Sequence, residues 1–167
     1  MRRRSGILMH ISSLYGDHSV GSFGRNALDF IDFLADNGFS AWQVLPFTVT
    51  DEYNSPYKFG GNPYFIDLET LFDDGLLTRE ELDGARQATP YYCEFDRLAK
   101  ERLPLLRKAY RRMKDFDKVG EFIAAHPRLE AFCRFMTLRE QNGGKRWQEW
   151  TQNEVTDGET LGMWQFI

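Results

Sequence analysis

Apolar residues near the start of the chain form two short runs. Between these runs lies a segment in which apolar residues recur with the spacing of a helix. The runs cover residues 6–11 and 41–47, and each has the length of a buried strand. The second run is apolar on both faces, as expected for a parallel strand covered by helices. Two such strands joined by a helix predict a right-handed βαβ crossover.

The stripe between these runs predicts a helix over residues 22–37. Its apolar positions recur at i, i+3, i+4 and i+7, the spacing of one buried helix face. They are Ala27, Phe30, Ile31 and Leu34. Asn37 and Gly38 predict the end of this helix, because glycine tolerates the left-handed conformation that closes helices. Asp32 falls on the other side, where we expect solvent.

Residues 48–64 predict a long loop, because they are rich in Asn, Pro, Gly and Tyr and show no sustained period. Loops of this length without their own secondary structure are usually functional or disordered. The aromatic and proline content favours an ordered, functional loop.

Beyond the loop the pattern changes to helical spacing. The predicted helices cover residues 69–74, 78–88, 95–115 and 119–141. Thr78 and Glu81 form a capping-box pattern at the start of the second one.

Four short motifs follow one another in the first part of the chain. They are Arg4-Ser5-Gly6-Ile7-Leu8-Met9-His10-Ile11-Ser12-Ser13-Leu14, Gly21-Ser22-Phe23-Gly24, Asn54-Ser55-Pro56-Tyr57 and Gly61-Asn62-Pro63-Tyr64-Phe65-Ile66-Asp67-Leu68. In this order they resemble the amylomaltases, the 4-α-glucanotransferases among the α-amylase-like glycosidases. The resemblance covers about residues 4–68 and reappears weakly afterwards.

This resemblance implies a (β/α)₈ TIM barrel, which needs roughly 250 residues, whereas the chain has 167. We therefore expect an α/β fold in which residues 1–68 form the first βαβ part of the barrel and its substrate loop. A mainly α-helical insertion is expected over residues 69–167. The apolar run at residues 161–167 lacks a helix-ending residue, so we expect a truncated, N-terminal piece.

The resemblance also implies substrate contacts. Tyr57 matches the tyrosine that lies beside the sugar at the cleavage point, and the alternative is a tyrosine that anchors the loop. Ser55 and Asn54 are expected to add hydrogen bonds to the sugar, although both residue types also initiate turns before proline. His10, at the end of the first strand, is expected either on the pocket floor or as a hydrogen-bonded core histidine. Asn62 is expected to fix the return of the chain into the barrel.

Retaining glycosyl transfer needs a nucleophilic carboxylate and an acid/base carboxylate roughly 5 Å apart. No carboxylate here lies in a context that resembles the family's catalytic motifs, and the resemblance implies that those acids lie beyond Ile167. The loop acids Asp51 and Glu52 are the best local candidates. We assign no catalytic residue to this chain, and we expect no metal or organic cofactor because two carboxylates of separated pKa suffice.

Composition limits the classes of partner that the chain is expected to bind and the compartment in which it is expected to occur. The formal net charge of −4 argues against a nucleic-acid partner, which needs a positive field. No apolar run has membrane-spanning length. Cys93 and Cys133 are too few and too widely spaced for a metal site or a disulfide framework, so we expect a reducing, cytoplasmic location.

The sequence therefore predicts the N-terminal portion of a 4-α-glucanotransferase that acts on α-1,4-glucans and maltooligosaccharides. The intact enzyme would pass a glucan segment to the 4-hydroxyl group of an acceptor with retention of configuration. A non-catalytic carbohydrate-binding piece or pseudo-enzyme is the alternative. A helical interaction module built on residues 95–167 is a third possibility.

Overall fold

The computed structural model describes residues 3–50 and 60–167. The chain divides into two compact units, Met1–Ala109 and Tyr110–Ile167. Each unit has its own helices, and each is described separately below.

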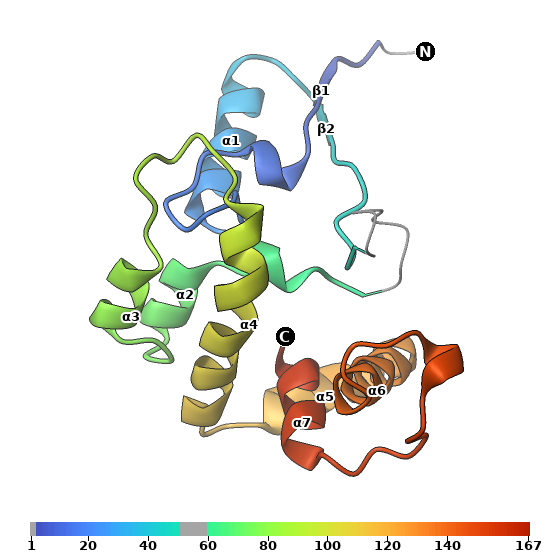
Figure 1. Ribbon diagram of the computed structural model, residues 1–167. Helices are drawn as coiled ribbons and strands as arrows, with labels where there is room; N and C mark the ends of the chain where they lie inside the picture. Colours follow the sequence, from blue (N-terminus) through green and yellow to red (C-terminus); the bar gives the residue numbers. More distant parts are fainter. Residues whose placement is uncertain (1–2, 51–59) are drawn as a thin grey trace. The chain divides into compact units, whose positions relative to one another are not determined.

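The first unit opens with two short parallel strands joined through a helix (Figure 1). These elements are β1 (Gly6–Leu8), α1 (Arg25–Asp36) and β2 (Ala41–Gln43). Ile7 lies opposite Trp42 in the ladder, and the Trp42 indole donates a hydrogen bond of 2.9 Å to the carbonyl of Met9. The start of the chain is therefore a mixed α/β structure with a small parallel sheet.

Both strands are shorter than the ranges predicted from the apolar runs. After β1, the side chain of His10 accepts a hydrogen bond from the amide of Ser12 and begins a 3₁₀ turn at Ile11–Ser13. After β2, Pro46 has no amide hydrogen with which to extend the ladder. The burial on both faces expected for the second run is wrong for the part of the chain described here, because Ala41 and Gln43 of β2 are exposed and Leu45 is 44% exposed.

Helix α1 buries a narrower face than its stripe predicts. Ala27 and Leu34 are buried, and the Phe30 ring packs edge-on against Trp42 at 4.9 Å, but Ile31 is 47% exposed. Among the described residues the sheet beside α1 has two strands, so it covers less than the full stripe. The predicted end of the helix is confirmed, since Gly38 has a φ of 77° there.

The remaining helices of the first unit follow the long loop. They are α2 (Leu68–Asp73), α3 (Arg79–Gly84) and α4 (Phe95–Arg112), and α4 runs on into the second unit. The capping box is confirmed, because the Glu81 amide donates to Thr78 Oγ1 at 3.2 Å and the Thr78 amide donates to Glu81 Oε2 at 3.0 Å. The buried core of this unit contains Ile11, Leu14, Val20, Ala27, Phe65 and Leu98.

The second unit is helical among its described residues. Its helices are α5 (Asp117–Ala125), α6 (Pro127–Gln141) and α7 (Gly158–Phe166), with a 3₁₀ turn at Trp147–Glu149. The single helix predicted over residues 119–141 is wrong. Pro127 cannot donate an amide hydrogen bond and restricts His126, which has φ −128° and ψ 68°, so the helix breaks there.

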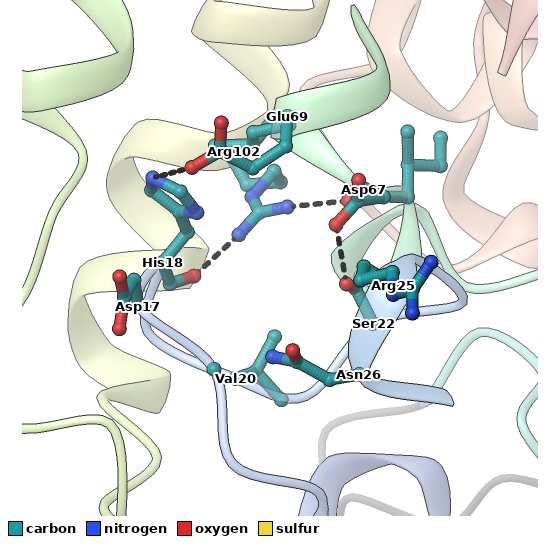
Figure 2. Close-up of a pocket in the computed structure, with 12 residues that line it drawn as sticks. Asp17, His18, Val20, Ser22, Arg25, Asn26, Asp67, Glu69 and Arg102 are labelled. Atoms are coloured by element: carbon teal, nitrogen blue, oxygen red, sulfur yellow. Dashed lines mark hydrogen bonds and ion pairs between the residues drawn. The ribbon is translucent and has the colours of Figure 1, made fainter. Parts of the chain in front are cut away.

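Asp67 joins two of the sequence motifs within the first unit (Figure 2). Its carboxylate accepts hydrogen bonds from the Ser22 hydroxyl at 2.7 Å and from the Thr70 amide at 2.9 Å, which caps α2. A Cβ atom on Gly24 would collide with this carboxylate, so only glycine fits there without a shift. The amide of Phe23 also donates to the carbonyl of Phe65 at 3.0 Å.

Arg102 closes the other side of this junction (Figure 2). It is 4% exposed, and its guanidinium donates to the carbonyl of Ile66 at 2.9 Å and to that of His18 at 2.7 Å. Burial lowers the pKa of Arg102 to about 10, with the nearby Asp67 carboxylate opposing the effect, so Arg102 stays charged at neutral pH.

His18 is buried beside Arg102 without a hydrogen-bond partner on Nε2 among the described residues. The nearest carboxylate oxygen, on Glu69, lies 3.9 Å from Nε2. Burial lowers the pKa of His18, and the charges of Arg102 and Arg86 lower it further, against smaller opposing effects of nearby carboxylates. Its surroundings at the junction therefore favour the neutral form of the imidazole.

The burial of Leu34 generates a stability prediction. Leu34→Ala should reduce the free energy of unfolding by roughly 2 to 5 kcal/mol, because it removes a buried side chain and leaves a cavity. Asp32→Ala, on the exposed side of the same helix, should change it by less than about 0.5 kcal/mol. Urea unfolding followed by circular dichroism measures both, and equal losses would show that the buried face is assigned wrongly.

The neutral His18 predicts a pH dependence of stability. The pKa of His18 is lower in the folded protein than in the unfolded chain. As the pH falls, the unfolded chain therefore protonates His18 before the folded protein does. The contribution of His18 is therefore full above its unfolded pKa of about 6.5 and is lost on acidification toward its folded pKa. Urea titrations between about pH 5 and 7.5 should show a shallower loss in His18→Gln than in the wild type.

The control for this experiment is His126→Gln, at an exposed histidine of the second unit. It should keep the acid-dependent loss of the wild type. A wild-type slope that survives in His18→Gln would contradict the assignment of that slope to His18.

Candidate functional site

A cavity of about 540 Å³ lies where the chain leaves the carboxyl ends of β1 and β2. In open α/β folds and barrels, this end of the strands is where ligands bind. The cavity has the size of a small-molecule site. Its walls are formed by His10, Ser12, Leu45, Pro46, Thr48, Thr50, Asn62, Tyr64, Phe65, Phe95, Asp96 and Ala99.

His10 lines this cavity, and both of its ring nitrogens are already hydrogen bonded within the protein. Nδ1 accepts from the Ser12 amide at 3.2 Å and lies 2.7 Å from Ser12 Oγ. Nε2 lies 3.2 Å from the carbonyl oxygen of Pro46. Because Nδ1 acts as an acceptor, this geometry assigns the proton to Nε2, which donates to Pro46. His10 thus links the two strand ends, and its role toward a sugar stays a prediction.

Asn62 fixes the return of the chain to this end of the sheet. Its side-chain oxygen accepts from the Tyr64 amide at 3.0 Å, and its side-chain nitrogen donates to the carbonyl of Thr48 at 3.5 Å. The Asn62 amide also donates to the carbonyl of Phe47 at 3.1 Å. These bonds hold Tyr64 against the cavity, where burial raises the pKa of its hydroxyl.

The other predicted sugar contacts, Asn54, Ser55 and Tyr57, lie outside the described residues, as do the loop acids Asp51 and Glu52. The described residues on either side of that segment include Thr50 and Asn62, and both line the cavity.

Asp96 is the one carboxylate among the described residues that line the cavity. The pair of facing carboxylates that retaining glycosyl transfer requires is therefore not found in this part of the structure. No group of three or more His, Cys, Asp or Glu side chains that would hold a metal ion occurs among the described residues. Over the same residues, no helix is long and apolar enough to cross a membrane.

The sequence did not indicate the wall formed by the start of α4. This wall consists of Phe95, Asp96 and Ala99. The sequence predicts that their segment is helical, but it does not predict that the segment reaches the cavity. Contacts distant in sequence bring it there, because Cys93 Sγ donates to the carbonyl of Ser12 at 3.0 Å and the Glu94 amide donates to the carbonyl of Ser19 at 2.9 Å. No local pattern encodes these contacts.

A second, smaller cavity of about 120 Å³ lies at the Asp67 junction (Figure 2). Its charged side chains serve mainly to bind one another and the backbone: Asp67 is bonded to Ser22 and Thr70, and Asp17 pairs with Arg86 at 2.9 Å. The larger cavity at the strand ends is therefore the candidate functional site.

Comparison with known proteins assigns a family. The family described as 4-alpha-glucanotransferase matches residues 9–166. A 4-alpha-glucanotransferase of Streptococcus pneumoniae is 38% identical over 160 residues, which cover 89% of this chain and 31% of the relative. The Thermus thermophilus enzyme is 36% identical, with coverage of 89% and 31%.

A solved structure agrees with these relatives. An amylomaltase from Streptococcus agalactiae in complex with acarbose matches with a TM-score of 0.87 and 28% identity, over 99% of this chain and 38% of that one. The chain thus spans about a third of the length of the proteins it matches. From the extent of the family match, this chain belongs to the 4-alpha-glucanotransferase family.

Proposed function

We propose that this chain is the N-terminal part of a 4-alpha-glucanotransferase, and that the cavity at the strand ends is part of its glucan-binding cleft. The observation that carries the proposal is the position of this cavity, at the carboxyl ends of β1 and β2, in a chain of this family. The whole enzyme would move a segment of an α-1,4-glucan or maltooligosaccharide to the 4-hydroxyl of another glucan with retention.

The proposal extends to the architecture. β1, α1 and β2 would be the first βαβ part of a (β/α)₈ barrel, and residues 69–167 would be a mainly helical insertion. The likeness to an amylomaltase at a TM-score of 0.87 supports this assignment. We also propose a cytoplasmic location, on the sequence argument from two widely spaced cysteines.

Within the cleft, Tyr57 would pack its ring on a pyranose face, and Ser55 and Asn54 would add hydrogen bonds to sugar hydroxyls. His10 would form part of the floor. Support comes from Thr50 and Asn62, which flank this segment and line the cavity. The catalytic carboxylates would lie outside this chain, since Asp96 alone supplies a carboxylate among the described lining residues.

The proposal predicts binding without catalysis. The purified chain should bind maltotriose, with a dissociation constant in the millimolar range because only part of the cleft is present, as seen by calorimetry. It should release no glucose and no longer maltodextrins on chromatography, whereas the full-length Streptococcus pneumoniae relative assayed in parallel should produce both. Transfer by this chain alone would contradict the placement of the catalytic acids.

Tyr57→Ala is the matched variant for this experiment. It should weaken maltotriose binding at least several-fold while leaving the melting temperature nearly unchanged, as expected for a pocket residue. A large loss of melting temperature with unchanged affinity per folded molecule would support the loop-anchoring alternative for Tyr57.

A further inference from the structure

The start of α4 contributes a carboxylate and an exposed aromatic ring to the wall of the candidate cleft. Phe95 and Asp96 are consecutive residues, and both line the cavity. The Phe95 side chain is 54% exposed. We propose that Asp96 is a glucan-binding residue, whose carboxylate accepts hydrogen bonds from the hydroxyl groups of a glucosyl unit packed on Phe95. This inference rests on the proposed function of the cavity.

Two polar side chains of the cavity are held by hydrogen bonds within the protein. His10 uses one ring nitrogen for Ser12 and the other for the carbonyl of Pro46. Asn62 uses its oxygen for the Tyr64 amide and its nitrogen for the carbonyl of Thr48. A sugar would have to displace an existing bond to use a ring nitrogen of His10, whereas Asn62 keeps one N–H and one lone pair beyond these bonds.

Asp96 differs from these groups and from the other acids of its neighbourhood. Glu94 accepts from the Ser19 hydroxyl and pairs with Arg97 at 3.2 Å, and Glu101 pairs with Arg97 at 2.8 Å. No described residue is hydrogen bonded to or ion-paired with Asp96, which is exposed. Its two oxygens are therefore free to accept from a ligand without breaking a bond to any described residue.

A sugar matches this pair of side chains chemically. A pyranose has an apolar face of C–H groups, which packs on an aromatic ring, and an edge of neighbouring hydroxyl donors. Hydrogen bonds to an ionised carboxylate are stronger than those to neutral acceptors, and its two oxygens can accept from two donors together. Phe95 and Asp96 offer both kinds of contact on one wall.

An acidic residue in the first turn of a helix also has an ordinary structural role, because it favours the positive end of the helix dipole. That role would appear in stability and not in sugar binding. The chain offers a matched control in Asp117, an acidic first-turn residue of α5 that does not line the cavity.

The experiment is a calorimetric titration of the whole chain with maltotriose. Asp96→Asn keeps the shape of the side chain but removes its charge, and it should weaken binding about tenfold or more, the loss expected for charged hydrogen bonds. Asp96→Glu, which keeps a carboxylate, should retain more affinity than Asp96→Asn. Asp117→Asn should bind as the wild type does, and circular dichroism checks that each variant is folded.

Two results would overturn the inference, and they are distinguishable. If the wild type binds maltotriose and folded Asp96→Asn binds it equally well, Asp96 is not a glucan contact, and the proposed function of the cavity stands. If the wild type does not bind maltotriose at millimolar concentration, both the cavity's proposed function and the role of Asp96 fall.

Discussion

The Asp67 carboxylate is the interaction on which the first unit depends. It accepts from the Ser22 hydroxyl and the Thr70 amide, and it lies against the bare Cα of Gly24. One side chain therefore fixes the entry into α1 and the start of α2. Because the Phe23 amide also bonds the carbonyl of Phe65, two motifs distant in sequence are held as one piece.

This junction determines where the cavity can form. The segment that ends at Asp67 begins with Asn62, whose bonds to Thr48 and Tyr64 bring the chain back beside the end of β2. His10 then links the end of β1 to Pro46. Hydrogen bonds therefore link the segments around the cavity, and such support helps to hold binding groups in position. Asp96, on the wall of the cavity, is an acceptor that has no hydrogen bond to any described residue.

Local patterns predicted what local physics determines. The end of α1 at Gly38 and the capping box at Thr78 are predictable from the sequence, because backbone conformation and neighbouring side chains determine them. Pro127 is also a local signal, because it breaks the helix between α5 and α6, whereas the apolar period over residues 119–141 alone predicts one continuous helix. The place of His10 after a strand left two roles open, the pocket floor or a hydrogen-bonded core histidine; it lines the cavity with both ring nitrogens bonded to the protein, and its role toward a sugar stays a prediction.

The rest depended on contacts between distant segments. The exposure of Ile31 follows from the width of the sheet beneath α1, which a stripe in one helix does not contain. The contribution of α4 to the cavity follows from bonds such as that of Cys93 to Ser12, between residues far apart in the chain. Composition and spacing do not encode contacts between distant segments, so they do not identify Phe95 and Asp96 as site residues.

The central claim is that the cavity at the strand ends holds an α-1,4-glucan, and mapping of backbone amide NMR shifts during a maltotriose titration tests it most directly. The account predicts saturable shifts at cavity residues such as Ser12, Asn62 and Ala99, with little change at Ser22 and Glu69 of the junction. Shifts concentrated at the junction or in the second unit, with none around the cavity, would contradict it.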